Sequence, residues 1–155
     1  MSPDLIPCAD RPGVHGTIRR VADDPLTTRA RAIWGGADFL PIARSFATGA
    51  AAFVGRLAVR PGEQVLDVAC GTGNLAIPAA RAGAVVTGVD IAPNLIEEAA
   101  AEAAAAGATV QLDVGDAEAL PYGDARFDLA MSMFGVMFQR WPPKSSMTTS
   151  GSGPE

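Results

Sequence analysis

The sequence predicts an α/β protein built on a doubly wound, mostly parallel β-sheet with helices on both faces. Short apolar runs suited to buried strands alternate along the chain with segments of helical periodicity. The first of these runs leads into a glycine-rich turn, and the second leads into an alanine-rich helix. Because crossovers between parallel strands are right-handed, this alternation indicates one sheet that helices cover on both faces.

The predicted elements follow one another in a regular order. Apolar residues at steps of three and four predict an amphipathic helix over residues 38–58. A second helix is predicted to begin at Pro93, run through an alanine-rich segment and stop at Gly107. Pro78 falls inside the helix expected after the first strand, so it must lie in or near the first turn or else kink the helix. The predicted strands lie within residues 64–70, 82–91, 109–116 and 126–138.

Both ends of the chain differ in composition from its middle. Residues 1–37 are expected to form an N-terminal arm, the first 25 of them without sustained periodicity. Eleven of the last 17 residues, 139–155, are Ser, Thr, Gly or Pro, which predicts a disordered tail. The folded domain is therefore expected to span residues 38–138.

Charge and composition argue against several classes of partner. The formal net charge is -5 and the 12 Lys and Arg residues are spread along the chain, so no nucleic-acid partner is expected. Two cysteines and one histidine cannot supply a four-ligand Cys/His metal site, and no metal is expected. The sequence has no apolar run of membrane-spanning length and no leader-like start, so we expect a cytoplasmic protein with reduced thiols.

The stretch LDVACGTGNLAI, residues 66–77, carries most of the functional signal. Gly71 and Gly73 lack side chains where a strand turns into a helix, so a ligand can approach the backbone and the helix N-terminus closely. GTGNLA (71–76) also fits the dinucleotide pattern G-x-G-x-x-A, with Asp90 about 20 residues after the turn. The turn alone therefore leaves a nicotinamide or flavin dinucleotide, another nucleotide and structural packing as alternatives.

Asp67 argues against a dinucleotide. It lies in the first predicted strand, four positions before Gly71. A carboxylate beside the turn repels a pyrophosphate, whereas it attracts a cationic ligand such as an amino acid joined to a sulfonium. The charge of this residue thus favours a sulfonium-bearing ligand.

Four segments share the order and spacing of the motifs of one enzyme family. They are VLDVACGTGN (65–74), GVDIAPNLIEEA (88–99), GDAEALPYGDARFDLAMS (115–132) and FGVMF (134–138). The chain resembles the class I S-adenosylmethionine-dependent methyltransferases, especially the methyltransferase type 11 group that includes ubiquinone/menaquinone-biosynthesis-like enzymes. The resemblance covers about residues 60–138. It implies a Rossmann-like sheet, S-adenosyl-L-methionine as cofactor, and transfer of a methyl group to a small-molecule acceptor.

The resemblance also implies roles for particular residues. Asp67, Gly71 and Gly73 would border the methionine part of the cofactor. Asp90 would accept hydrogen bonds from both ribose hydroxyls, since a carboxylate can accept two bonds from a vicinal diol. The complete implied cofactor-binding set is Asp67, Ala69, Gly71, Gly73, Asn74, Asp90, Ile91, Asp116, Ala117 and Met133.

The adenine end of the implied site rests on residues after the second and third strands. Ile91 would pack on the adenine face, and Asp116 with Ala117 would contact the adenine edge. In the alternative interpretation, Asp90 and Asp116 only cap the turns that follow them. Methyl transfer needs no enzyme nucleophile, so no catalytic residue is assigned. His15 titrates near neutral pH and is a candidate base, but we expect it on the surface.

The resemblance implies seven strands, of which about four are predicted here. We therefore interpret the chain as a shortened methyltransferase. The open alternatives are a cofactor-binding remnant with weak or no turnover and, less favoured, an NAD(P)-dependent oxidoreductase. The fourth strand would form an uncovered apolar edge, and such an edge favours pairing with another chain. Self-association through this edge is a further expectation.

Overall fold

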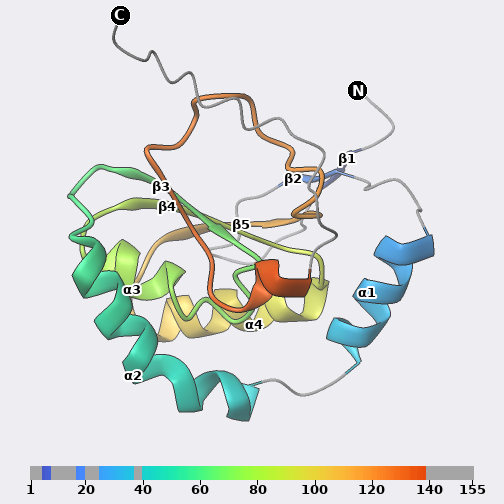
Figure 1. Ribbon diagram of the computed structural model, residues 1–155, viewed down its shortest axis with the longest axis horizontal. Helices are drawn as coiled ribbons and strands as arrows, with labels where there is room; N and C mark the ends of the chain where they lie inside the picture. The colour runs from blue at the N-terminus through green and yellow to red at the C-terminus, as the bar shows by residue number, and fades with distance from the viewer. Residues whose placement is uncertain (1–4, 8–16, 20–24, 37–39, 139–155) are drawn as a thin grey trace, which may run out of the picture.

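The structure is a computed structural model that describes residues 5–7, 17–19, 25–36 and 40–138 (Figure 1). The predicted disordered tail, 139–155, lies outside the described residues, as does most of the predicted N-terminal arm before residue 25. His15, the candidate base, also falls outside them.

Parallel strands form the central sheet, in the order β5-β4-β3-β6. Asp67 in β3 lies opposite Gly88 in β4 and Met131 in β6. The chain moves from β3 outward to β5 and then returns to β6, so the direction of winding reverses beside β3. This confirms the predicted Rossmann-like, parallel sheet. Its strands are β3 (Gln64–Val68), β4 (Val85–Asp90), β5 (Val110–Val114) and β6 (Leu129–Met131).

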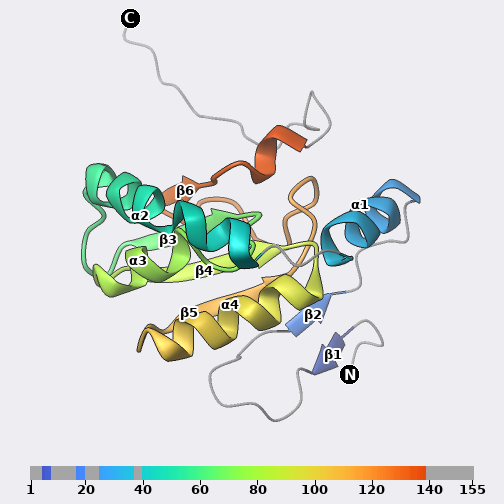
Figure 2. The same cartoon turned by 90° about the horizontal axis from the view of Figure 1, so that it is seen from below.

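Three helices lie on one side of the sheet, as Figures 1 and 2 show: α2 (Leu40–Leu57), α3 (Ala76–Arg81) and α4 (Pro93–Ala105). The buried positions of α3 are alanines, and α4 adds two more, so both helices approach the strands closely. Pro78 is the third residue of α3 and lies in its first turn, as predicted. Gly107 has a positive φ of 64° just after α4, which ends the helix.

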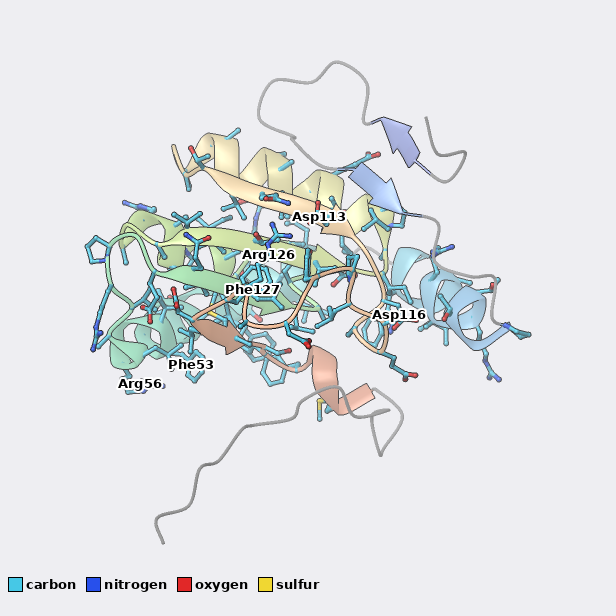
Figure 3. The ribbon with its side chains drawn as sticks, turned by 90° about the horizontal axis from the view of Figure 1, so that it is seen from above. Phe53, Arg56, Asp113, Asp116, Arg126 and Phe127 are labelled. Atoms are coloured by element: carbon cyan, nitrogen blue, oxygen red, sulfur yellow. The ribbon has the colours of Figure 1, made fainter. Side chains whose placement is uncertain are left out.

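The opposite side of the sheet differs from the expectation. Residues 115–128, all of which the structure describes, cross it as a loop without a helix (Figure 3). The Tyr122 hydroxyl donates a hydrogen bond to Asp113 Oδ2 at 2.8 Å. The rings of Tyr122 and Phe127 meet edge to face at 5.1 Å, and the Arg126 guanidinium lies 4.9 Å from the Tyr122 ring. A polar and aromatic cluster thus holds this loop on β5 where the winding predicts a helix.

The N-terminal segment contains elements that the sequence interpretation did not assign. Helix α1 (Pro25–Gly35) stands at the carboxyl ends of the strands, and β1 (Leu5–Pro7) pairs antiparallel with β2 (Thr17–Arg19). A Cβ added at Gly35 would lie 3.2 Å from Asn94 Oδ1, so α1 closely approaches the start of α4. Two side-chain hydrogen bonds join α1 to the strand ends. Leu26, Ala30, Ile33 and Trp34 recur at helical steps, a short pattern that the sequence interpretation did not use.

The chain after β6 is also less regular than its apolar sequence predicts. The expected fourth strand lay within 126–138, but β6 is only three residues long. It is followed by a short 3-10 helix, η1 (Gly135–Phe138). Phe134, just before η1, has a positive φ of 68°, which turns the chain out of the strand direction. This turn brings residues 133–137 over the carboxyl end of β3.

Candidate cofactor-binding cavity

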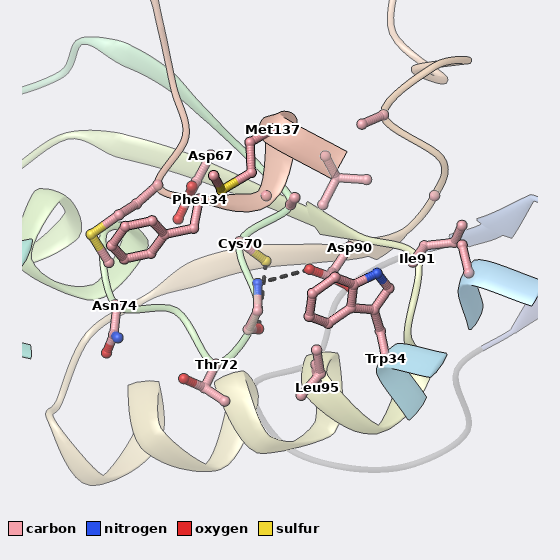
Figure 4. Close-up of a pocket in the computed structure, with 18 of the residues that line it drawn as sticks. Trp34, Asp67, Cys70, Thr72, Asn74, Asp90, Ile91, Leu95, Phe134 and Met137 are labelled. Carbon is pink, nitrogen blue, oxygen red and sulfur yellow. Dashed lines mark hydrogen bonds between the residues drawn. The ribbon is translucent and has the colours of Figure 1, made fainter. Parts of the chain in front are cut away.

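A cavity of about 860 Å³ opens at the carboxyl ends of β3, β4 and β5 (Figure 4). Its walls come from α1, the start of α2, the turn after β3 and the segment 133–137. In sheets of this kind, ligands bind outside the carboxyl ends of the strands, where the winding reverses. The cavity occupies that place beside β3.

The glycine turn after β3 has an unusual backbone. Ala69, Gly71 and Gly73 all have positive φ, of 55°, 53° and 88°. A Cβ on Gly71 would meet nothing within 4 Å, and Gly71 lines the cavity. A Cβ on Gly73 would lie 3.2 Å from the Ile77 side chain and 3.6 Å from Ala99 Cβ. Gly71 therefore leaves space for a ligand, whereas Gly73 leaves space for the packing of α3 against α4.

Asp67 lies in the cavity wall with one oxygen unsatisfied. The residue is only 1% exposed, and its Oδ2 has no hydrogen-bond partner in the described structure. Burial raises the pKa of this carboxyl to about 8; the backbone N–H of Ala76 lowers it in part, and the charge of Asp90 raises it further. A buried acceptor without a donor, beside a cavity, is suited to a cationic ligand.

Asp90, the last residue of β4, joins two turns. Its Oδ2 accepts the N–H of Gly71 at 2.9 Å, drawn dashed in Figure 4, and its Oδ1 accepts the N–H of Ala92 at 3.0 Å. Burial raises the pKa of Asp90, and these N–H groups oppose the increase. Asp90 therefore does cap the turns, as the alternative interpretation expects. Each oxygen keeps a second lone pair, so capping and ligand binding are compatible.

Asp116 follows β5 and is similarly occupied. Its Oδ1 accepts the N–H of Glu118 at 2.9 Å, and its Oδ2 accepts the hydroxyl of Thr27 in α1 at 2.8 Å. One helical turn further along α1, Arg31 Nε donates to the Ile91 carbonyl at 3.3 Å. Sequence reasoning missed these partners because 89 and 60 positions separate them. We refer to Asp67, Asp90 and Asp116 as the strand-end carboxylates.

The other part of the cavity is apolar. We define the aromatic wall as Ile42 and Phe46 of α2 with Phe134 and Met137 of the segment after β6. The rings of Phe46 and Phe134 lie 5.2 Å apart. All four side chains are 45% to 68% exposed, and with Ile33 they are five of the six exposed large hydrophobic residues in the described part of the chain. Exposed apolar surface is therefore concentrated at this cavity.

Nine of the ten residues in the predicted set line the cavity; Gly73 is the exception. Asn74 also donates a hydrogen bond from Nδ2 to the Ala43 carbonyl at 2.7 Å, so it joins the turn to α2. Within the described residues, no three His, Cys, Asp or Glu side chains are grouped to hold a metal ion. None of the described helices is both long and apolar enough to cross a membrane.

The strand order, the glycine turn and the acidic strand ends define a nucleotide-binding domain of the Rossmann-like class. Residues 65–149, more than half of the chain, match the family model described as a methyltransferase domain. The chain belongs to this family and is a class I S-adenosylmethionine-dependent methyltransferase domain. The family and the fold imply S-adenosyl-L-methionine as the cofactor.

Two curated relatives are similar in sequence, and one of them is named a methyltransferase. The uncharacterized protein Rv1405c of Mycobacterium tuberculosis is 39% identical over 117 residues, which are 75% of this chain and 43% of that protein. Aklanonic acid methyltransferase DauC of Streptomyces sp. is 43% identical over 81 residues, 50% of this chain and 37% of that protein. The chain thus spans less than half the length of these curated relatives.

A solved structure supports the fold. The TehB-like SAM-dependent methyltransferase from Corynebacterium glutamicum matches with a TM-score of 0.50 at 23% identity, over 74% of this chain and 58% of that chain. The residues of the cavity also fit the cofactor chemically. The unsatisfied Oδ2 of Asp67 suits an ammonium group, and the open side of Gly71 leaves room beside it.

Proposed function

We propose that this chain transfers the methyl group of S-adenosyl-L-methionine to a small-molecule acceptor, and that the cavity at the strand ends binds both. The observation that carries the proposal is the unpartnered Oδ2 of Asp67, buried in the cavity wall. Leaving a buried acceptor without a donor is costly, and a ligand with an ammonium group supplies the missing donor. A pyrophosphate would instead add negative charge beside Asp67 and Asp90.

The methionine end of the cofactor is assigned to the turn after β3. Asp67 accepts the ammonium group, and Ala69 and Gly71 lie along the chain that leads to the sulfur. Asn74 and Met133 complete this end of the site. The role of Gly73 is indirect, because its small size supports the packing of α3 against α4.

The adenosine end is assigned to the residues after β4 and β5. Asp90 accepts the ribose hydroxyls through the lone pairs that its two backbone donors leave free. Ile91 packs against the adenine face. Asp116 and the N–H of Ala117 contact the adenine edge, with an acceptor and a donor side by side.

We assign the acceptor to the aromatic wall. Its four side chains carry no charge and leave a large apolar surface open to solvent. Burying that surface favours an apolar, flat acceptor over a charged one. The relative DauC is named for aklanonic acid, which supports a small-molecule acceptor for this chain as well.

Alignment is the main contribution that we assign to the protein. When bound, the cofactor supplies a methyl group on a positively charged sulfur. Holding two reactants in line contributes on the order of 7–11 kcal/mol to lowering the barrier. The residues of the aromatic wall have no titratable side chains, so we assign no general base among them. The wall orients the acceptor and excludes water from the methyl group.

Location and self-association are also proposals. Cys70 is a free, buried thiol in the glycine turn, which supports a reducing, cytoplasmic location. β6 is the outer strand of the sheet on its side, and an open strand edge can pair with a second chain. Light scattering over a range of concentrations tests the second proposal, because pairing through β6 produces a concentration-dependent dimer.

The test of function is transfer of a radiolabelled methyl group by the purified chain. The acceptors are hydroxylated naphthalenes and anthraquinones in one set, and charged amines and carboxylates in the other. We expect product in the first set only. Binding of S-adenosylhomocysteine without any transfer would contradict the enzymatic proposal and leave a cofactor-binding domain.

A further inference from the structure

Thr27 is a buried polar residue in a helix that the sequence interpretation did not assign. It lies in the first turn of α1 and is 7% exposed. Its hydroxyl donates to Asp116 Oδ2 at 2.8 Å, and Asp116 is itself only 9% exposed. Two buried polar side chains from segments 89 positions apart therefore meet at the adenosine end of the cavity.

The Asp116 carboxylate accepts this bond from a different segment than its other bond. Its other observed donor is the N–H of Glu118, two residues along the same loop. That local bond moves with the loop, whereas Thr27 lies on a separate helix. A carboxylate bonded from two directions has both its plane and its rotamer fixed, which preorganises the remaining lone pairs for a ligand.

Helix α1 is attached at a second point on the same face. Arg31, four residues after Thr27, donates to the Ile91 carbonyl after β4 at 3.3 Å. Positions i and i+4 lie on one face of a helix. Trp34 of α1 also lines the cavity, as do Asp90 and Ile91 (Figure 4). One face of α1 therefore borders the part of the cavity assigned to adenosine.

We propose that Thr27 is a positioning residue for base recognition: its hydroxyl orients the Asp116 carboxylate that reads the 6-amino group of adenine, and it thereby couples the docking of α1 to the identity of the base. The inference rests on the proposed function. A correctly oriented carboxylate accepts from a 6-amino group but repels a 6-oxo group. The adjacent Ala117 N–H likewise suits the N1 acceptor of adenine but not the N1–H of hypoxanthine.

The experiment is calorimetric titration of the full chain with S-adenosylhomocysteine and with S-inosylhomocysteine, which differ at the base. The variants are Thr27→Val, which keeps the shape and removes the donor, and Thr27→Ser, which keeps the donor. Thr28→Val is the matched control, because Thr28 is the exposed neighbour in the same turn. Circular dichroism melts establish that each variant is folded.

We expect wild type to favour the adenine compound by at least about tenfold. Thr27→Val should weaken adenine binding roughly tenfold and change inosine binding by less than about twofold, so that most of the preference disappears. Thr27→Ser and Thr28→Val should keep the wild-type preference. Equal losses for both compounds in Thr27→Val, or no loss, would overturn the inference and leave Thr27 a packing residue.

The failure of the proposed function gives a different result. If the wild-type chain binds neither compound, the proposed cofactor site is contradicted, and the inference about Thr27 fails with it. Wild type that binds both compounds equally leaves the cofactor site intact but contradicts base reading by Asp116. A second readout is the rate of amide hydrogen exchange in α1. S-adenosylhomocysteine should slow this exchange more in wild type than in Thr27→Val, because the coupling between helix and ligand is reciprocal.

Discussion

The strand-end carboxylates and the aromatic wall line the same cavity, but they differ in how far their side chains are buried and hydrogen-bonded. The carboxylates are 1% to 9% exposed, and Asp90 and Asp116 are already hydrogen-bonded on both oxygens. The side chains of the aromatic wall are 45% to 68% exposed. The part of the cavity that we assign to the cofactor is therefore preorganised by the fold, whereas the part that we assign to the acceptor still has apolar surface to bury. Substitutions at the two ends should separate cofactor binding from acceptor use.

The largest effect on cofactor affinity is expected from substitution of Asp90. Asp90→Ala removes the acceptor proposed for two ribose hydroxyls, and charge-assisted hydrogen bonds contribute about 1.5–3 kcal/mol each. We expect the affinity for S-adenosylhomocysteine to fall about a hundredfold or more by calorimetry. The control is Asp124→Ala, since Asp124 is an exposed acid on the loop across the other side of the sheet.

The Asp90 substitution also affects the fold, because it leaves the N–H groups of Gly71 and Ala92 without their acceptor. Asp90→Asn keeps one oxygen and should retain more stability while still losing affinity. Unchanged affinity in folded Asp90→Asn would contradict the ribose assignment.

The second-largest effect is a pH dependence of ligand affinity that originates at Asp67. The pKa of this carboxyl is about 8, against an ordinary value of 3.8. Below pH 8 the empty site holds a neutral carboxyl, and a cationic ligand must displace the proton. The affinity for S-adenosylhomocysteine should therefore rise by up to about tenfold per pH unit between pH 6 and pH 8, then level off. Asp67→Asn should bind weakly and without this slope; a flat wild-type profile would contradict the ammonium assignment.

The same residue predicts the sign of a stability change. Between pH 4 and pH 8 the folded chain holds a proton on Asp67 that the unfolded chain has lost. Its contribution to the free energy of unfolding should thus fall as pH rises, by up to about 1.4 kcal/mol per pH unit. Urea unfolding at pH 6 and pH 8 should show a smaller loss for Asp67→Asn than for wild type.

Alanine substitutions at two glycines should have a third, smaller effect on ligand affinity. Gly71 and Gly107 both have positive φ, and a Cβ on either would meet nothing within 4 Å. Alanine at each should lower stability equally, by about 1–2 kcal/mol. Only Gly71→Ala places a methyl group in the cavity, so only it should weaken S-adenosylhomocysteine binding, roughly tenfold. Equal binding by the two variants would remove Gly71 from the site.

The smallest effect on cofactor binding is expected at the aromatic wall. Phe46→Ala and Phe134→Ala remove half-exposed rings, so they should cost less than about 1 kcal/mol of stability and leave cofactor affinity within about twofold. Methyl transfer to a hydroxynaphthalene acceptor should show a KM raised roughly three- to tenfold. Phe53→Ala is the control, because Phe53 is on the same helix but packs against the core; it should lower stability without this change in KM.

The strand-end carboxylates and the aromatic wall also differ in how well the sequence predicted them. Strand ends are predictable because buried strands have short apolar sequences and parallel strands bring their carboxyl ends together. Asp67, Asp90 and Asp116 could therefore be placed near one another from local sequence. The sequence could also place Pro78 in the first turn of one helix and identify Gly107 as the end of another.

The features of the cavity that the sequence did not predict depend on contacts between segments far apart in the chain. The bond from Thr27 to Asp116 spans 89 positions and involves no apolar periodicity. Phe46 and Phe134 lie 5.2 Å apart only because the chain turns at Phe134, where φ is positive for a residue that rarely adopts it. At Gly73 the motif predicts a ligand contact, and the structure adds a packing role beside Ile77 and Ala99 that the motif did not indicate.

The cavity is proposed to bind an adenosine linked to a cationic amino acid. The most direct measurement is calorimetric titration of the wild-type chain with S-adenosylhomocysteine, and separately with NADH, at pH 8, which is close to the pKa of about 8 of Asp67. We predict saturable, one-to-one binding of S-adenosylhomocysteine and at least about tenfold weaker binding of NADH, since its pyrophosphate meets the strand-end carboxylates. Tighter binding of NADH would contradict the account and favour a dinucleotide site.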